Sequence, residues 1–273
     1  MTPSLSARPP LDRTRITAGP REAGPDLVVE VVEEATSTNA VLAQRARDGA
    51  PEGLVVVAEH QSAGRGRLDR SWEMPARSGL IVSVLLRPTV PTRCWPWLPL
   101  LTGYAVGRTL REAGFPAAGV KWPNDALIHD RKVAGILVEV VDTPTGMAAV
   151  VGIGLNVDLA ADELPVPTAT SLALEAGERG TPDRAELLGE LLDTLMETYG
   201  AWQRDGEEGA RRLRAAYRDA CVTLGRDVRV ELPSGAALLG RATDIDDSGR
   251  LIVEGPDGPV AVGAGDVIHV RPA

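Results

Sequence analysis

The chain has 273 residues, of which 44% are hydrophobic and 25% are charged, and its formal net charge is −9. This size supports one sizeable hydrophobic core with a small second unit, and the composition is that of an ordinary soluble globular protein. The acidic balance argues against nonspecific binding to nucleic acid or anionic membranes, and no apolar run approaches the ~20 residues of a membrane helix.

Strands alternate with helices in the first part of the chain. Residues 26–35 are rich in β-branched side chains and predict a strand. A helix follows, for which Ser37 or Thr38 is the expected N-cap. Continuous apolar runs over 53–60 and 79–88 predict strands of the buried kind.

A helix over 95–114 leads into three apolar runs with turn residues between them. This pattern predicts a hairpin and a returning strand. We expect the hairpin to turn at Asp130-Arg131, so that residues 126–129 pair with residues 133–136.

In the last third of the chain, the sequence pattern changes from helices to short strands. A strong helix is expected to begin at Thr181 and Pro182, and a second helix follows it. Past Leu224, short alternating runs are punctuated by PSG, DDSG, GPDG and GAGD, which is typical of a small all-β barrel or sandwich. The chain is therefore expected to divide into a disordered tail (1–26), a main domain (27–224) and a C-terminal module (225–273).

The segment 61–72 shows little periodicity and carries three arginines among two glycines. Glycine lets backbone N–H groups approach an anion closely, and a guanidinium group can fork onto phosphate or carboxylate oxygens. A long unpatterned loop inside a compact domain is usually functional or disordered, so a solvated surface loop is the alternative. The residues concerned are Gly64, Arg65, Gly66, Arg67, Arg70 and, at the end, Trp72 as an anchor or a core residue.

Both lysines of the chain, Lys121 and Lys132, lie in the stretch KWPNDALIHDRK, and every other Lys/Arg position is arginine. Pro123 favours an extended residue before it, and Asn124-Asp125 is expected to form a tight turn at a strand end. The hairpin then returns Lys132 to this turn, so that two ammonium groups, a carboxylate and an amide converge. A hairpin with an exposed ion pair is the alternative.

Two weaker signals complete the candidate site. The Gly-rich strand end GIGLN carries Asn156, which can read a base edge or a sugar. Ser37, Thr38 and Asn39 at a helix N-terminus offer donors and a positive dipole end to a carboxylate or carbonyl group. Ordinary N-capping is the alternative for these three residues.

Taken in order, these pieces resemble the biotin protein ligase family. The match runs through TSTN, QSAGRGRLDRSW, KWPNDALIHDRKVAGILVE and GIGLNVD, and GDVIHVR is similar to that family's C-terminal module. The resemblance implies an α/β (α+β) fold: a class II synthetase-like mixed sheet flanked by helices, with a small C-terminal SH3-like β-barrel. It also implies that biotin and MgATP give biotinyl-5′-AMP, and that a lysine of the biotin carboxyl carrier domain of an acyl-CoA carboxylase takes the biotinyl group.

The resemblance also implies roles for individual residues. Lys132 is expected to contact the biotin carboxylate and the α-phosphate, Asp125 to position or deprotonate the acceptor amine, and Arg67 to act in the loop that closes over them. The expected biotin-binding residues are Ser37, Thr38, Asn39, Gln61, Gly64, Arg65, Gly66, Arg67, Lys132 and Gly135. The expected ATP-binding residues are Arg65, Arg70, Trp72, Lys121, Asn124, Asp125 and Asn156.

Two features depart from the family pattern. Asp69 stands where the GRGRxGRxW motif has glycine, and a carboxylate there can pair with Arg67 or Arg70. The 26-residue tail is too short and too Pro-rich for a winged helix-turn-helix, so no repressor domain is expected. The alternatives are a lipoate or octanoate ligase or transferase of the same superfamily, a non-catalytic biotin-sensing regulator, and a binding module.

Cysteine and histidine give no ligand spacing. Cys94 and Cys221 are far apart in sequence, and the three histidines are scattered. We therefore expect buried thiols in a reducing cytoplasm and no protein-built metal site. The oligomeric state is left open by the sequence.

Overall fold

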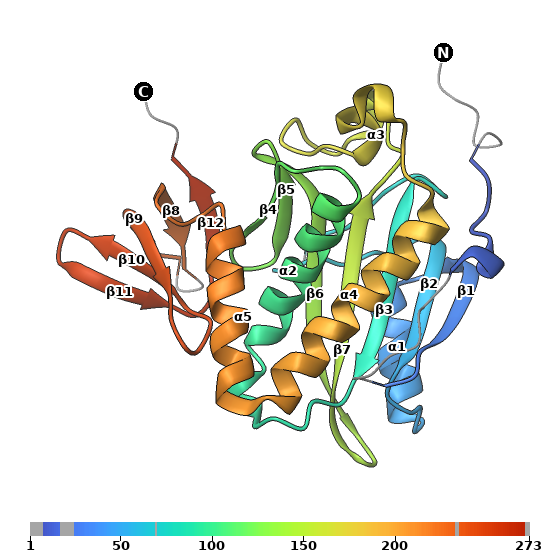
Figure 1. Cartoon of the computed structure of the whole chain (residues 1–273), viewed down its shortest axis with the longest axis horizontal. Helices are drawn as coiled ribbons and strands as arrows, with labels where there is room; N and C mark the ends of the chain where they lie inside the picture. The colour runs from blue at the N-terminus through green and yellow to red at the C-terminus, as the bar shows by residue number, and fades with distance from the viewer. Residues whose placement is uncertain (1–7, 17–24, 69, 233–234, 271–273) are drawn as a thin grey trace.

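The computed structural model describes residues 8–16, 25–68, 70–232 and 235–270. Within them, the chain forms a seven-stranded mixed sheet in the order β1-β2-β3-β7-β6-β5-β4 and a five-stranded sheet in the order β11-β10-β9-β8-β12 (Figure 1). The expected mixed α/β fold with a small all-β unit at its C-terminal end is confirmed.

The large sheet is parallel between β1 and β2 and antiparallel elsewhere. Its central strands are aliphatic on both faces because both faces are covered, and every residue of β3 is buried. The strands are β1 (Val28–Ala35), β2 (Leu54–Gln61), β3 (Gly79–Leu86), β4 (Ala118–Lys121), β5 (Asp125–Ile128), β6 (Arg131–Thr143) and β7 (Gly146–Asn156).

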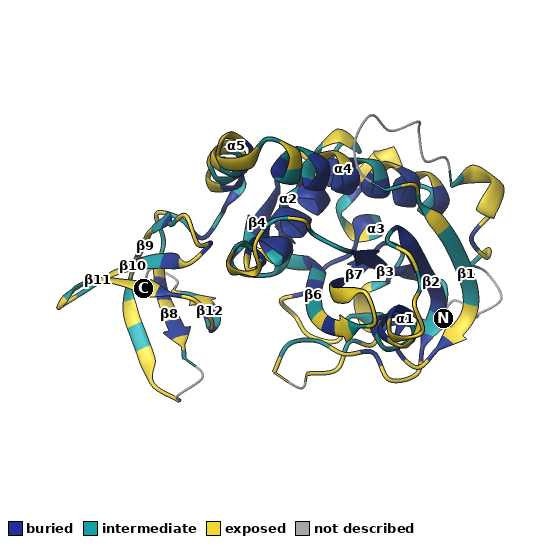
Figure 2. Ribbon diagram, turned by 90° about the horizontal axis from the view of Figure 1, so that it is seen from below, coloured by how far each residue is buried: buried dark blue, intermediate teal, exposed yellow. Residues whose placement is uncertain are grey.

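Helices cover the two faces of this sheet. The long helices α2 (Trp97–Glu112), α4 (Arg184–Arg204) and α5 (Gly206–Ala220) lie on one face, and α1 (Thr38–Arg47) lies on the other (Figure 2). The short helix α3 (Leu172–Glu175) follows the loop after β7. No helix of the described residues is both long enough and apolar enough to cross a bilayer.

The five-stranded sheet is antiparallel and lies beyond β4 (Figure 1). Two indole groups of the main body hold it: Trp97 Nε1 donates to the Asp247 carbonyl at 2.8 Å, and Trp122 Nε1 donates to the Gly249 carbonyl at 2.9 Å. Its strands are β8 (Asp227–Glu231), β9 (Ala237–Ile245), β10 (Leu251–Gly255), β11 (Gly258–Val262) and β12 (Asp266–His269).

Part of the expected disordered tail, 1–26, is in fact docked on the main body. Residues 8–16 contain a short 3-10 helix, and Leu11 is buried in the main core. The Leu11 N–H donates to Glu59 Oε1 at 2.5 Å. Composition predicted disorder because the segment is Pro-rich, whereas a few specific contacts hold it. The tail residues before 8 and those from 17 to 24 lie outside the described part of the chain.

The β5–β6 hairpin turns at His129-Asp130, one residue earlier than expected. Both residues have positive φ, 48° and 65°, which is the conformation of a two-residue type I′ turn. Ile128 therefore pairs with Arg131 across the turn. Asp is among the residues that tolerate this region, so the turn chemistry was present, but the register was not readable from it.

The turn before β5 also differs from the prediction. Lys121 pairs directly with Asp125, so the turn is formed by Trp122, Pro123 and Asn124, with a cis bond before the proline. Asp125 is thus the first residue of a strand and not part of the turn.

Helix α4 begins after its N-cap Asp183 and not at Thr181-Pro182 as expected. The Asp183 side chain accepts hydrogen bonds from the backbone N–H groups of Ala185 and Glu186, at 2.9 and 3.1 Å. An aspartate cap satisfies two otherwise unpaired donors and suits the positive end of the helix dipole, which explains the start.

Candidate active site

Two adjoining cavities lie over the large sheet. The first cavity is bounded by the N-terminus of α1, β2, the 61–72 segment, β6 and β7. The second cavity lies between that segment, the β4–β6 hairpins, the loop after β7 and the C-terminal sheet. The residues that line both cavities are Arg70, Ser71, Trp72, Asp125 and Lys132.

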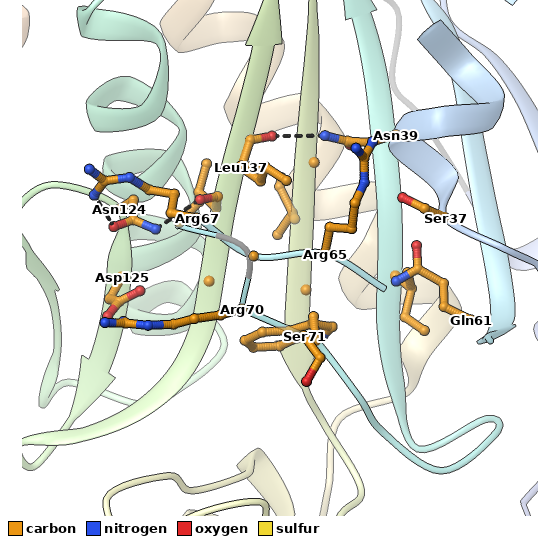
Figure 3. Close-up of a pocket in the computed structure, with 18 of the residues that line it drawn as sticks. Ser37, Asn39, Gln61, Arg65, Arg67, Arg70, Ser71, Asn124, Asp125 and Leu137 are labelled. Atoms are coloured by element: carbon orange, nitrogen blue, oxygen red, sulfur yellow. Dashed lines mark hydrogen bonds between the residues drawn. The ribbon is translucent and has the colours of Figure 1, made fainter. Parts of the chain in front are cut away.

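A buried set of hydrogen bonds forms one wall of the first cavity. The Thr38 N–H donates to Gln61 Oε1 at 2.7 Å, and the Ser83 hydroxyl donates to Asn39 Oδ1 at 2.6 Å. Asn39 Nδ2 donates to the Leu137 carbonyl at 3.2 Å (Figure 3). These hydrogen bonds fix the side chains, so they present ordered donors and acceptors to a small polar group.

Glycines on β6 and β7 form the floor of the same cavity. A Cβ atom on Gly154 would lie 2.3 Å from the Trp72 ring, and one on Gly135 would lie 2.9 Å from it. A Cβ on Gly152 would lie 2.3 Å from Asn39 Oδ1. Trp72 Nε1 is buried and has no hydrogen-bond partner among the described residues. The floor therefore needs glycine to admit the indole and the amide.

The 61–72 segment closes on itself. The Trp72 N–H donates to the Gly64 carbonyl at 2.9 Å, and the Gly66 N–H donates to the Arg70 carbonyl at 2.7 Å. A Cβ on Gly64 would lie 2.1 Å from the Trp72 carbonyl oxygen, so glycine is required there. Of the residues expected to bind biotin, Gly64 is the one that the described lining of the first cavity lacks.

Arginine side chains tie this segment to the sheet. Arg67 Nη1 donates to Asn124 Oδ1 at 2.9 Å (Figure 3). Arg65 forms an ion pair with Glu139 at 3.2 Å. Burial lowers the pKa of the Arg67 guanidinium from its usual value, although Asp125 opposes the shift. Since a half-buried cation with a neutral amide partner keeps its charge available, Arg67 is suited to an anionic ligand.

Lys132 and Asp125 meet at the junction of the cavities. The two atoms Lys132 Nζ and Asp125 Oδ1 are 2.6 Å apart, and Lys132 Nζ lies 5.4 Å from the Trp72 ring centroid. The pKa of Lys121 is lowered, first by burial and then by the nearby charges of Lys132 and Arg70, while Asp125 opposes the shift. Several cations thus surround one carboxylate, and the excess positive charge favours a polyanion.

The C-terminal sheet contributes side chains that the sequence did not point to. Arg70 pairs with Asp266 on β12, and His269 from the same strand lines the second cavity. The pKa of His269 is lowered to about 4, first by burial and then by the charges of Lys121 and Arg226. His269 is therefore neutral at physiological pH.

Asn156 lines the second cavity, and its amide is hydrogen-bonded to the protein itself. Asn156 Nδ2 donates to the Thr170 carbonyl at 2.9 Å. The same loop reaches β6, where the Lys132 N–H donates to the Thr168 carbonyl at 2.8 Å. Asn156 therefore fixes the loop that walls the second cavity.

Comparisons with known proteins agree with this architecture. The model of the biotin/lipoate A/B protein ligase family matches residues 30–156, and that of the biotin protein ligase C-terminal domain matches residues 223–270. The chain is 42% identical to a biotin–[acetyl-CoA-carboxylase] ligase of Mycobacterium tuberculosis, over 99% of this chain and 100% of the relative. The chain belongs to the biotin protein ligase family.

Further relatives of this family cover most of the chain. The bifunctional ligase/repressor BirA of Bacillus subtilis is 33% identical over 85% of the chain and 71% of the relative. The solved structure of the Aquifex aeolicus biotin protein ligase in complex with biotin and ATP matches with a TM-score of 0.74 and 26% identity. That match covers 89% of this chain and 99% of the other.

Within this biotin protein ligase fold, the structure gathers the predicted residues around the two cavities. Arg65 and Asn124, expected on the nucleotide side, line the first cavity, whereas Lys121 and Asn156 line the second. Gly152 and Gly154 alternate along the strand, and this pattern in the sequence could have predicted a strand face without side chains. Residues that sequence reasoning missed are Ser71, Ile81, Ser83, Ile136, Leu137, Glu139, Gly152, Gly154, Asp266 and His269.

Proposed function

We propose that this chain activates biotin with MgATP to biotinyl-5′-AMP and transfers the biotinyl group to a lysine of the biotin carboxyl carrier domain of an acyl-CoA carboxylase. The observation that carries the proposal is the junction of two cavities at Lys132 and Asp125. One cavity has a buried polar wall for a small neutral ring, and the other has cations for a polyphosphate. The curated ligase relatives support this assignment.

Biotin is assigned to the first cavity. Its ureido ring carries donors and acceptors that match the ordered groups of Thr38, Asn39 and Gln61. Its carboxylate end then points toward Lys132, where the cavities join. The glycine floor and the Trp72 indole provide the apolar surface for the rest of the molecule.

MgATP is assigned to the second cavity. Five cations line it, and they are assigned to the phosphates: Arg70, Lys121, Lys132, Arg226 and Arg241. Among the described residues, no group of three or more His, Cys, Asp or Glu side chains is placed to hold a metal ion. Mg²⁺ commonly binds through substrate phosphates with one or two carboxylates, so we assign it to ATP, with Asp125 as the nearby carboxylate.

In the first half-reaction a biotin carboxylate oxygen attacks the α-phosphorus of ATP, and the bond to the pyrophosphate oxygen breaks. Two anions must approach each other, so fixed positive charge at the point of contact lowers the barrier. Lys132 supplies that charge from the junction of the cavities. Arg67 supports it from the loop, where its guanidinium pairs with the Asn124 amide.

In the second half-reaction the acceptor lysine nitrogen attacks the biotinyl carbonyl carbon, and AMP leaves. The amine must lose a proton, and Asp125 is the carboxylate that lies at the junction. Until the acceptor arrives, the mixed anhydride has to be shielded from water, and the 61–72 segment lies over the first cavity for this purpose (Figure 3).

We also propose that the activity divides along the chain. Residues 27–224 supply most of the lining of both cavities, and from residues 225–273 Asp266 lines the first cavity and His269 the second. The two free cysteines suit a reducing compartment, so we place the reaction in the cytoplasm.

Transfer to a carrier domain tests the proposed function. The purified chain is mixed with MgATP, a biotin carboxyl carrier domain and either biotin or lipoate, and the acceptor mass is measured. We expect a gain of one biotinyl group with biotin and no gain with lipoate. A lipoyl gain without a biotinyl gain would make the chain a lipoate ligase, the alternative within its superfamily.

A further inference from the structure

Arg8 forms ion pairs with the loop that lines one side of the second cavity. We call residues 8–16 the N-terminal arm and residues 157–171 the β7–α3 loop. Arg8 Nη1 and Nη2 lie 3.1 and 2.5 Å from the two carboxylate oxygens of Glu163, and Nε lies 3.3 Å from Asp158 Oδ2. The side chains of Arg8 and Glu163 are only 12% and 14% exposed. Bidentate pairs of this kind are geometrically specific.

The arm itself rests on a buried ion pair of the main body. Arg184 Nη1 lies 2.7 Å from Glu59 Oε2, and Arg184 Nη2 donates to the Pro9 carbonyl at 2.7 Å. Glu59 also accepts the Leu11 N–H, and Leu11 is buried. Arg8 is therefore presented to the loop from a fixed base.

The part of the loop that Arg8 contacts, residues 158–163, packs beneath the floor of the first cavity. Leu159 is 1% exposed and forms an apolar cluster with Met74 and Ile81, and Trp72 and Leu164 pack against this cluster. Arg8 contacts Asp158 and Glu163, which directly precede Leu159 and Leu164 in the chain. It therefore holds the backbone next to both leucines of the cluster that includes Trp72.

The other end of the loop is fastened to the catalytic strand. The Thr170 N–H donates to the Lys132 carbonyl, and the Lys132 N–H donates to the Thr168 carbonyl, both at 2.8 Å. Ala169, between these two contacts, and Val166, just before them, line the second cavity. A displacement of the loop would therefore move Lys132, Trp72 and the wall of the nucleotide cavity.

We propose that Arg8 is a positioning residue of the adenylation site, and that the N-terminal arm clamps the β7–α3 loop against Trp72 and Lys132. The inference rests on the proposed function for its catalytic consequence. Arg8 touches no cavity lining of either substrate site among the described residues, so it acts through the loop. The pKa of the Glu163 carboxyl is lowered, first by the hydrogen bond from Arg8, as expected for a formed charge pair.

The chain offers a matched control on the same arm. Arg15 pairs with Asp183 at 2.8 Å and with Glu186 at 2.7 Å, both at the start of α4, so its carboxylate partners do not belong to the loop. Arg8→Ala and Arg15→Ala thus each remove one guanidinium with two carboxylate partners. We expect Arg8→Ala to raise the KM for ATP in biotin-dependent pyrophosphate exchange by about three- to thirtyfold, with kcat changed less, and Arg15→Ala to change neither.

Two further variants keep the test decisive if Arg8→Ala folds poorly. Glu163→Gln weakens the clamp and leaves the arm intact, and it should raise the KM for ATP in the same direction. Arg8→Lys keeps the charge without the bidentate fork, and it should fall between the wild type and Arg8→Ala. A wild-type KM in Arg8→Ala or Glu163→Gln, or equal effects of Arg8→Ala and Arg15→Ala, would overturn the positioning role.

Amide hydrogen exchange of the ligand-free chain tests the clamp without any catalytic readout. We expect faster exchange in peptides covering 158–171 for Arg8→Ala, and no change there for Arg15→Ala. Unchanged exchange in that stretch for Arg8→Ala would overturn the clamp. A wild-type chain that shows no biotin-dependent pyrophosphate exchange would refute the proposed function, and the amide exchange would still decide the clamp.

Discussion

Lys132 stands where the two cavities join, in a chain that uses arginine at all but two of its Lys/Arg positions. Its Nζ atom fits between the Asp125 carboxylate and the Trp72 ring, and a Cβ on Gly135 would lie 3.2 Å from it. This space suits a compact ammonium group that can shift with the reacting oxygens, and it does not suit a planar guanidinium.

Substitution of Lys132 should therefore stop the first half-reaction. We expect Lys132→Ala and Lys132→Arg each to lower biotin-dependent pyrophosphate exchange by about a hundredfold or more, since a fixed charge at the reacting centre is lost or misplaced. Arg131→Ala is the control, because Arg131 is exposed and pairs with Glu175 at 2.6 Å. Wild-type exchange in a folded Lys132→Arg variant would show that charge alone is needed.

At this scale the sequence predicted most of the residues that line the first cavity. The family resemblance placed Asn39, Gln61 and Lys132 in one site, and the structure brings them together in the lining of that cavity. The sequence did not reveal Ser83 or Glu139, whose partners lie 44 and 74 positions away. Such pairings depend on strand register, which single residues do not encode.

Under the proposed function, the 61–72 segment is the element that would retain the intermediate. Arg67 fastens it to Asn124, and Trp72 seats its end over Gly154. The start of the segment is held by backbone hydrogen bonds to Ala35 and Thr36, whereas the part from Arg65 to Arg70 has its own backbone hydrogen bonds and exposed ion pairs, which contribute little. Loss of the Arg67 contact should therefore loosen the closure over the first cavity.

We predict that Arg67→Gly releases biotinyl-5′-AMP into solution. Free adenylate should rise about tenfold or more relative to wild type when biotin and MgATP are present without an acceptor, because water and product exchange through a loosened loop. Chromatography of the filtrate measures it. Arg77→Gly is the control, since Arg77 has a φ of 62° that glycine adopts easily and pairs with Glu33 outside both cavities. Equal retention by both variants would argue against a sealing role.

Periodicity predicted the strands and helices of the main body, and the structure confirms them with small shifts at their ends. The positions of the turns were harder to predict from the sequence. The pairing register of the flanking strands determines that the turns fall at Trp122–Asn124 and at His129-Asp130. The arm at 8–16 was missed for a related reason. Its order comes from Leu11 and Arg8 meeting distant partners, and a Pro-rich composition carries no sign of them.

At the scale of the whole molecule, the C-terminal sheet completes the nucleotide side. His269 faces the cations Lys121 and Arg226 and the carboxylate of Asp130, and its ring lies 3.2 Å from Thr223 Oγ1. Its pKa is lowered to about 4 in the folded chain, against an ordinary histidine value near 6.5. The joint between the two sheets is therefore built around a neutral imidazole.

This joint predicts a pH dependence of stability. Between the two pKa values the unfolded chain binds a proton that the folded chain excludes, so stability rises with pH in this window and is lost as pH falls toward 4. Because the ring is only half-buried and solvent screens its charge, from pH 7 to pH 5 we expect wild type to lose about 1 kcal/mol more unfolding free energy than His269→Gln. Urea midpoints at both pH values measure this. Equal losses in the two proteins would contradict the buried neutral state.

The sequence indicated the C-terminal module but not its share of the site. The texture after Leu224 predicted a small all-β unit, and the family resemblance predicted its type. That Asp266 and His269 line the cavities follows from how Trp97 and Trp122 seat the second sheet on the first. Contacts between the two sheets depend on their three-dimensional shapes, and these shapes cannot be predicted from a hydrophobic pattern along the chain.

A competition for one acceptor tests the central claim most directly. The chain is incubated with MgATP, equal concentrations of biotin and lipoate, and a biotin carboxyl carrier domain, and the intact acceptor is weighed by mass spectrometry. The account predicts a single biotinyl adduct on the acceptor lysine, absent without ATP and absent with Lys132→Ala. A lipoyl adduct in its place, or no adduct with wild type, would contradict it.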